Sequence, residues 1–126
     1  MCYGYCSTEL EVEPQEATLR DSTWSEDKSI CPDLKVRAYL SDRHWKELEH
    51  LIDRESLFSL PDRVGCPGCV DEPIQSVEIR FSNHTNKAIY YNYGDAPQEI
   101  RSLSAKLEAL HDKLKKELHP ITQCAH

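Results

Sequence analysis

Four cysteines in two close pairs have the clearest capacity for chemistry in this chain. Cys2 and Cys6 lie at the start of the sequence, and Cys66 and Cys69 flank a Pro-Gly dipeptide near its middle. The CxxC spacing of the second pair is that of thiol-redox motifs. Four thiolates can also hold a tetrahedral zinc ion, and in an oxidising compartment the same sulfurs form disulfides. The two pairs therefore point to redox chemistry, a zinc site or disulfide cross-links.

The surroundings of the central pair favour disulfides over redox chemistry. A reactive CxxC cysteine sits at a helix N-terminus, where the helix dipole lowers the pKa of its thiol. Here Asp71 and Glu72 follow Cys69 closely, a strand-like segment comes next, and neighbouring carboxylates raise the pKa of a thiol. Six cysteines in 126 residues are also many for a reducing compartment. We expect disulfides, with zinc held by Cys2, Cys6, Cys66 and Cys69 as the alternative and free thiols as a third state.

Cross-links between the N-terminal and the central pair are the expected connectivity. A bridge within a CxxC motif closes a very small loop, whereas a link across about 60 residues contributes on the order of 4 kcal/mol in the loop-closure model. Cys31 and Cys124 are left over. The sequence does not decide whether these two pair or stay free.

The rest of the sequence holds no recognised catalytic pattern. It lacks GxSxG, HExxH, a glycine-rich phosphate loop and a convincing nucleophile beside a base. His111 and His119 are expected on a solvated helix face. Tyr90 and Tyr93 belong to a group of tyrosines that could line a binding face, although tyrosine is also a common strand residue. We predict a non-enzymatic protein without a cofactor, zinc being the alternative, that binds an unknown protein or small ligand.

Composition limits the kinds of partner and the cellular compartments that we expect for this protein. The formal charge is -7, with 22 acidic against 15 basic side chains, so nucleic acid is not an expected partner because phosphate backbones need clustered Lys and Arg. No apolar run approaches the roughly 20 residues of a membrane span, and no signal peptide follows Met1. The protein is therefore either cytoplasmic or exported, with a removed signal that this chain lacks.

Hydrophobic periodicity places the elements that carry these residues. Alternation predicts strands at 7–13, 17–20 and 34–40, and helical spacing predicts a helix at 41–54, capped by Ser41 and followed by an apolar tail to 60. Residues 61–73 form the cysteine loop and 74–94 a β-hairpin. A long helix over 95–119, with Asp95 and Gln98 as its capping box, precedes a tail at 120–126.

These elements predict one α+β domain over 1–126, with N-terminal strands in 1–40 and the helix and its tail in 41–60. We expect an antiparallel sheet of about four to five strands, with one medium helix and the long C-terminal helix packed on one face. That helix is roughly 36 Å long at 1.5 Å per residue. Its last turns could extend past the sheet and meet a second copy, which would make a homodimer.

The order of several motifs resembles a family of small uncharacterised bacterial envelope proteins, many of lipoprotein type. The resemblance rests on Cys2-Tyr3-Gly4-Tyr5-Cys6, Gly65-Cys66-Pro67-Gly68-Cys69, Val77-Glu78-Ile79 and Tyr93-Gly94. Gly68 stands where the family usually has Asp. The resemblance implies an exported periplasmic or secreted protein, with a membrane tether through a lipoprotein signal absent from this chain. It implies no activity, so a disulfide-stabilised binding or structural domain of the envelope is expected, and a zinc-binding or thiol-redox protein is the alternative.

Overall fold

The computed structural model describes residues 5–23, 33–67, 69 and 73–117. The chain divides into two compact units, one made of Met1–Glu47 with Leu107–His126 and the other of Leu48–Lys106. Two helices belong partly to each unit, so each unit is described with its own share of them. No helix in the described part of the chain is both long and apolar enough to cross a membrane.

The first unit is built on a three-stranded antiparallel sheet, sheet A. Its strands are β1 (Tyr5–Glu13), β2 (Glu16–Thr23) and β3 (Leu34–Tyr39), in the order β1-β2-β3. A tight turn joins β1 to β2, with Gln15 at a positive φ of 72°. The register places Leu10 opposite Leu19 and Leu19 opposite Val36. Apolar residues therefore share one face of the sheet, as the alternation in the sequence predicts.

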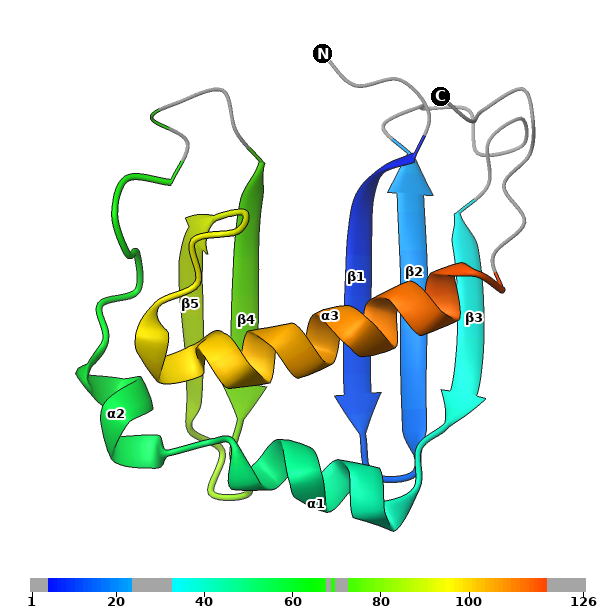
Figure 1. Cartoon of the computed structure of the whole chain (residues 1–126), viewed down its shortest axis with the longest axis horizontal. Coiled ribbons are helices and arrows are strands. Elements are labelled where there is room, and N and C mark those ends of the chain that lie inside the picture. The colour runs from blue at the N-terminus through cyan, green and yellow to red at the C-terminus, as the bar shows by residue number, and fades with distance from the viewer. Residues whose placement is uncertain (1–4, 24–32, 68, 70–72, 118–126) are drawn as a thin grey trace. The chain divides into compact units, whose positions relative to one another are not determined.

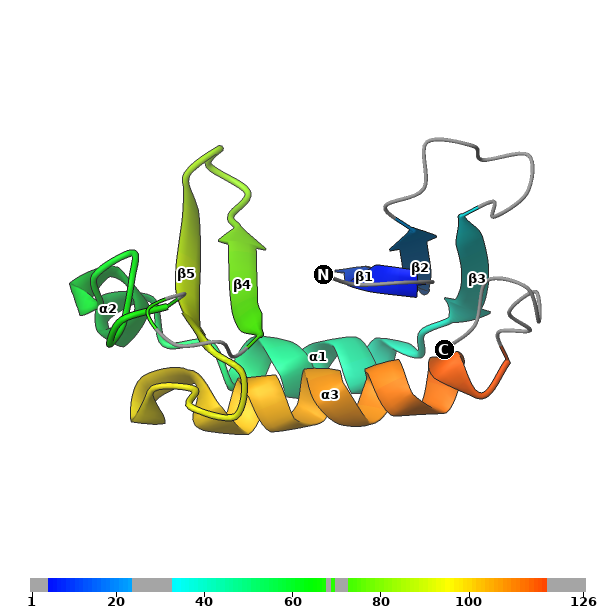
Figure 2. The same ribbon diagram turned by 90° about the horizontal axis from the view of Figure 1, so that it is seen from above.

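The apolar face of sheet A is covered by the second half of α3 (Arg101–Lys115), which lies across the strands in both views (Figure 1, Figure 2). Leu19 and Leu40 are fully buried there with Leu110 and Leu114 of the helix. The opposite face carries charged side chains, including Arg20, which pairs with Glu11 at 3.0 Å. Sheet A is thus half-buried, with one apolar and one solvated face.

The second unit contains a two-stranded antiparallel sheet, sheet B, and short helices. Sheet B pairs β4 (Ile74–Arg80) with β5 (Asn86–Asn92). The helices are α2 (Arg54–Ser59), the 3₁₀ turn η1 (Gln98–Ile100) and the first turns of α3. The end of α1 (Asp42–His50) also belongs here. The core of this unit is a buried cluster of Leu57, Ile89, Tyr91 and Ile100.

The α+β class, the antiparallel pairing and the long C-terminal helix are confirmed. The five strands in the described part of the chain, however, form two sheets rather than the single sheet that we expected. The reason lies in the connections, because β3 and β4 are separated by two helices and a loop, and no hairpin turn joins them. The prediction of one domain over 1–126 stays a prediction.

The helix expected at 41–54 is shorter, and the apolar tail expected after it forms a second helix. Ser41 caps α1 as predicted, its hydroxyl accepting from the backbone N–H of His44 at 3.2 Å. The helix ends at His50, and the side chain of Asp53 caps α2 by accepting from the N–H of Glu55. The apolar tail is therefore helical, because Asp53 offers a second N-cap directly before it.

The capping box predicted at the start of the long helix is wrong. Pro97 takes the cap position of η1 without any side-chain hydrogen bond, and α3 begins only at Arg101. A residue before proline is disfavoured in the helical region, so Ala96 cannot continue a helix started at Asp95. The predicted end of the helix at 119 lies outside the described residues.

Candidate functional site

The central cysteines are paired with each other. A disulfide joins Cys66 to Cys69, and their Cα atoms are 5.5 Å apart. A turn in which the N–H of Cys69 donates to the carbonyl of Cys66 brings them together, and this Cα separation lies in the range that disulfides require. This local bridge differs from the expected cross-link to the N-terminal pair. The turn explains the difference, because it places the nearest sulfur three residues away.

The remaining cysteine predictions fall outside what the structure describes. Cys2, Cys31 and Cys124, and the side chain of Cys6, are not among the described residues. Within the described ranges, no group of three or more His, Cys, Asp or Glu side chains could hold a metal ion. The four-cysteine zinc site therefore stays a prediction.

A chain of hydrogen bonds in the first unit links a hydroxyl, an imidazole and a carboxylate. The Nε2 atom of His111 lies 3.2 Å from Oγ1 of Thr8, and its Nδ1 atom lies 3.1 Å from Oδ1 of Asp112. This is the order of groups that activates a nucleophile. The Asp112 side chain, however, is 71% exposed, so water screens its charge. We assign these residues a structural role, joining α3 to β1.

One carboxyl group of β1 has a shifted pKa. Glu13 has a raised pKa, first because its side chain hydrogen-bonds to Glu11 and then because the charge of Glu11 repels it. Glu16 adds repulsion from the facing strand. Glu13 is exposed and Glu11 and Glu16 are partly exposed, so these carboxylates form a solvated acidic edge of sheet A.

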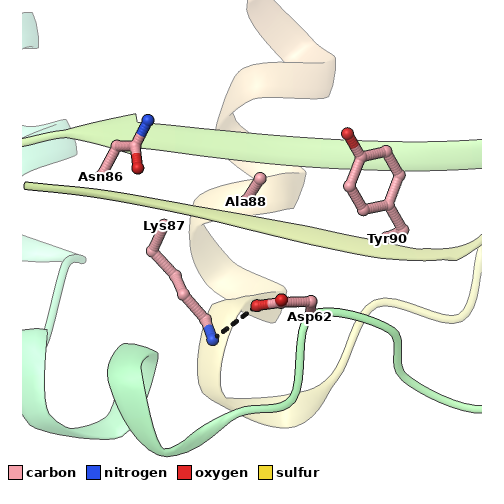
Figure 3. Close-up of a pocket in the computed structure, with 5 residues that line it drawn as sticks. All are labelled: Asp62, Asn86, Lys87, Ala88 and Tyr90. Carbon is pink, nitrogen blue, oxygen red and sulfur yellow. Dashed lines mark hydrogen bonds and ion pairs between the residues drawn. The ribbon is translucent and has the colours of Figure 1, made fainter.

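A shallow hollow in the second unit gathers polar groups of another kind. Its volume is about 300 Å³, and it lies along β5 (Figure 3). We call it the β5 hollow, lined by Asp62, Asn86, Lys87, Ala88 and Tyr90.

The β5 hollow exists because a neighbouring segment pairs with β5 over one residue only. The N–H of Tyr90 donates to the carbonyl of Asp62 at 2.8 Å, and the N–H of Val64 donates to the carbonyl of Tyr90 at 2.9 Å. These bonds form a single parallel bridge between Arg63 and Tyr90. To continue this pairing, the carbonyl of Leu60 would have to accept from the N–H of Ala88, but it accepts from Nζ of Lys87 instead. The chain therefore separates from β5 at this point.

The separation leaves main-chain groups of β5 facing the hollow. In an antiparallel pair, the residues that bond to the partner strand alternate with residues whose N–H and C=O point to the other side. Tyr90 points away from β4, because it bonds to Asp62 and Val64. Ala88, two residues earlier, then presents its N–H and C=O on the same edge. The hollow thus offers one backbone donor and one backbone acceptor.

Lys87 joins β5 to the segment that contains Leu60 and Asp62. Its Nζ atom donates to the carbonyl of Leu60 at 2.6 Å and to Oδ1 of Asp62 at 3.1 Å. The Lys87 side chain is only 11% exposed, whereas that of Asp62 is 81% exposed. Figure 3 shows the lysine extending from β5 to the aspartate. A largely buried ammonium must be hydrogen-bonded, and these two acceptors meet that need and hold it in place.

Tyr90 supplies the aromatic part of the hollow. It is 40% exposed, and the guanidinium carbon of Arg63 lies 5.8 Å from the centre of its ring. That distance is within the range of a cation–π contact. The contact orients the ring, while the exposed side chain of Asn86 completes the hollow.

Sequence reasoning named only Tyr90 among these residues, as one of several tyrosines. The alternation of residues along β5 could also have identified Lys87. Lys87 alternates with Ile89 and Tyr91, which are both completely buried, so a cation occupies a core-facing position of the strand. A charged residue in such a register needs a partner. The identity of that partner, Asp62, is not readable from the pattern.

Comparison with family models, with curated proteins and with solved structures finds no match to this chain.

Proposed function

We propose that this protein is a non-enzymatic binding domain of the bacterial cell envelope, stabilised by disulfides, and that it binds a small ligand in the β5 hollow. The observation that carries the proposal is the set of residues with hydrogen-bonding groups along one strand edge. Asn86, Ala88 and Tyr90 of β5 line the hollow, and they carry a side-chain amide, a main-chain N–H and C=O, and a hydroxyl. A concave site with a few convergent polar groups is the usual form of a ligand site.

Binding suits the hollow better than catalysis. The amine that could act as a nucleophile, Lys87, is committed to Leu60 and Asp62. An amine acts as a nucleophile only when its nitrogen can reach the substrate, and this nitrogen is held by two hydrogen-bond acceptors and its side chain is only 11% exposed. The remaining groups donate and accept hydrogen bonds without a nucleophile–base arrangement.

The envelope setting is supported by cysteine chemistry and by the family resemblance. Six cysteines in 126 residues, with a bridge between Cys66 and Cys69, suit an oxidising compartment, where disulfides persist. A thiol-redox protein is the second candidate, favoured by one observation. Cys66 and Cys69 are exposed and lie in a CxxC turn, so a thiol partner could reach them.

Intact mass spectrometry with and without reductant separates these two functions. A disulfide-stabilised domain should gain two hydrogens for each bond reduced and should keep its bridges in a glutathione buffer of cytosolic poise. A redox protein would exchange them readily and would show a Cys66 or Cys69 thiol titrating well below about 8.5. A mass that falls on adding chelator would instead reveal bound zinc.

The binding proposal is tested by titrating ¹⁵N-labelled full-length protein with a panel of small probes. The panel is N-acetylglucosamine, glucose, sodium acetate, inorganic phosphate, ethanolamine and the dipeptide Ala-Ala. The proposal expects at least one probe to shift the Ala88 and Asn86 amide signals saturably. If every probe leaves those two signals unchanged at high millimolar concentration, the hollow is not the binding site.

A further inference from the structure

We infer that the β5 hollow accepts a neutral sugar ring, bound through neighbouring hydroxyl groups. This inference rests on the proposed function, since it names the class of ligand for the same site. It follows from the charge of the hollow, from its pattern of donors and acceptors, and from its size.

The charges of the two charged lining residues cancel, and the nearby guanidinium of Arg63 lies against the Tyr90 ring, 5.8 Å from its centre. Lys87 and Asp62 carry opposite unit charges and lie 3.1 Å apart. A carboxylate or phosphate ligand would meet the Asp62 carboxylate, and an ammonium ligand would meet Lys87. Like charges brought together at a binding site oppose association. A neutral ligand meets neither penalty.

The hydrogen-bonding groups stand in donor–acceptor pairs. Lys87 Nζ and Asp62 Oδ1 form one pair, and an ammonium has three donors, of which the lysine spends two on Leu60 and Asp62. The N–H and C=O of Ala88 form a second pair. A hydroxyl both donates and accepts, so a ligand with adjacent hydroxyls can satisfy both members of each pair. A purely apolar ligand would leave them unpaired at a cost in binding.

The aromatic side chain and the volume match one ring. Tyr90 lines the hollow with a partly exposed ring on the same face of β5 as Asn86 and Ala88, and aromatic rings offer a large apolar contact area together with a polar tip. The C–H face of a sugar provides the complementary apolar surface. A volume of about 300 Å³ is at the lower end of ligand sites, which suits a single residue of a glycan.

The same titration panel tests this inference separately from the proposed function. We expect N-acetylglucosamine or glucose to shift the Ala88 and Asn86 amide signals saturably, and acetate, phosphate and ethanolamine to leave them in place. If a charged probe or Ala-Ala shifts them and the sugars do not, the ligand class is wrong while the site stands. If no probe shifts them, both proposals fail.

Two variants localise the sugar contacts. Asn86→Ala removes an exposed amide at the end of β5 and should weaken sugar binding roughly fivefold, as expected for one lost hydrogen bond. Ser102→Ala removes an exposed hydroxyl on α3, outside the lining residues, and should leave the affinity within about twofold. Both variants should keep the dispersed amide spectrum of the folded chain. Equal affinities for the two variants would overturn the assignment of the sugar to the hollow.

Discussion

Lys87 and Asp62 lie 25 positions apart in the chain, yet the lysine ammonium is 3.1 Å from the aspartate carboxylate. The same ammonium donates to the carbonyl of Leu60 at 2.6 Å. These contacts hold the segment after α2 against β5, in addition to the single backbone bridge at Tyr90. The ion pair therefore helps to hold the two sides of the β5 hollow together, and its two opposite charges cancel.

Removing the lysine should destabilise the fold more than removing the charge of the aspartate. Lys87→Met leaves the part-buried carbonyl of Leu60 without its donor, and an unsatisfied buried acceptor costs about 1–3 kcal/mol. Asp62→Asn changes a carboxylate that is 81% exposed, and exposed ion pairs contribute about 0–1 kcal/mol. Urea denaturation of both variants measures the difference. A larger loss for Asp62→Asn would show that the ion pair, rather than the bond to Leu60, holds the segment.

A buried pair of hydroxyls in the second unit should show energetic coupling. The Tyr91 hydroxyl lies 3.3 Å from Oγ of Ser104 on α3, and both residues are buried. Tyr91→Phe and Ser104→Ala should each cost about 1 kcal/mol, since either leaves the other hydroxyl without this partner.

The double variant is the control for that pair. It should lose less stability than the sum of the single losses, because its second substitution removes a group that has already lost this partner. Denaturant unfolding of the four proteins completes the cycle. Strict additivity would mean that the two hydroxyls do not interact in solution.

The raised pKa of Glu13 predicts a dependence of stability on pH. Hydrogen bonding to Glu11 and repulsion from it raise the pKa above the ordinary value of 4.5 for a glutamate. The folded state therefore binds this proton more tightly than the unfolded state does. The ionised form carries a penalty at neutral pH, and the penalty is lost as the pH falls through the raised pKa.

Glu13→Gln should accordingly raise the melting temperature at neutral pH and low salt, and the gain should vanish below 4.5. Glu55→Gln is the matched control. It removes an acid from the first turn of α2, where the helix dipole favours negative charge, so it should lower the melting temperature at neutral pH. A gain for Glu13→Gln that persists in acid would contradict an electrostatic origin.

The sequence predicts local structure well here and long-range partners poorly. Alternation around Leu10, Leu19 and Val36 places the strands of sheet A, and Ser41 marks the start of α1, because each of these signals acts over a few residues. The contacts of Lys87 with Asp62 and of Thr8 with His111 span 25 and 103 positions. Such partners depend on the way in which whole elements pack, so no local pattern encodes them.

The final prediction concerns Asp21, a carboxylate on the apolar face of sheet A. It is 6% exposed, and its Oδ1 atom is buried without a hydrogen-bond partner. Its Oδ2 atom lies 4.0 Å from Nζ of Lys115, a side chain that is 56% exposed.

A buried charge with so weak a partner costs more in desolvation than it gains in attraction. Asp21→Leu should therefore raise the free energy of unfolding by about 1 kcal/mol, because the new side chain would share a face of β2 with the buried Leu19 and lie opposite Leu34 of β3. Lys115→Met should have the opposite effect, because it removes the only countercharge recorded for Asp21 among the described residues. Urea denaturation at neutral pH measures both changes, and a loss of stability in Asp21→Leu would show that the carboxylate has a stronger partner than Lys115.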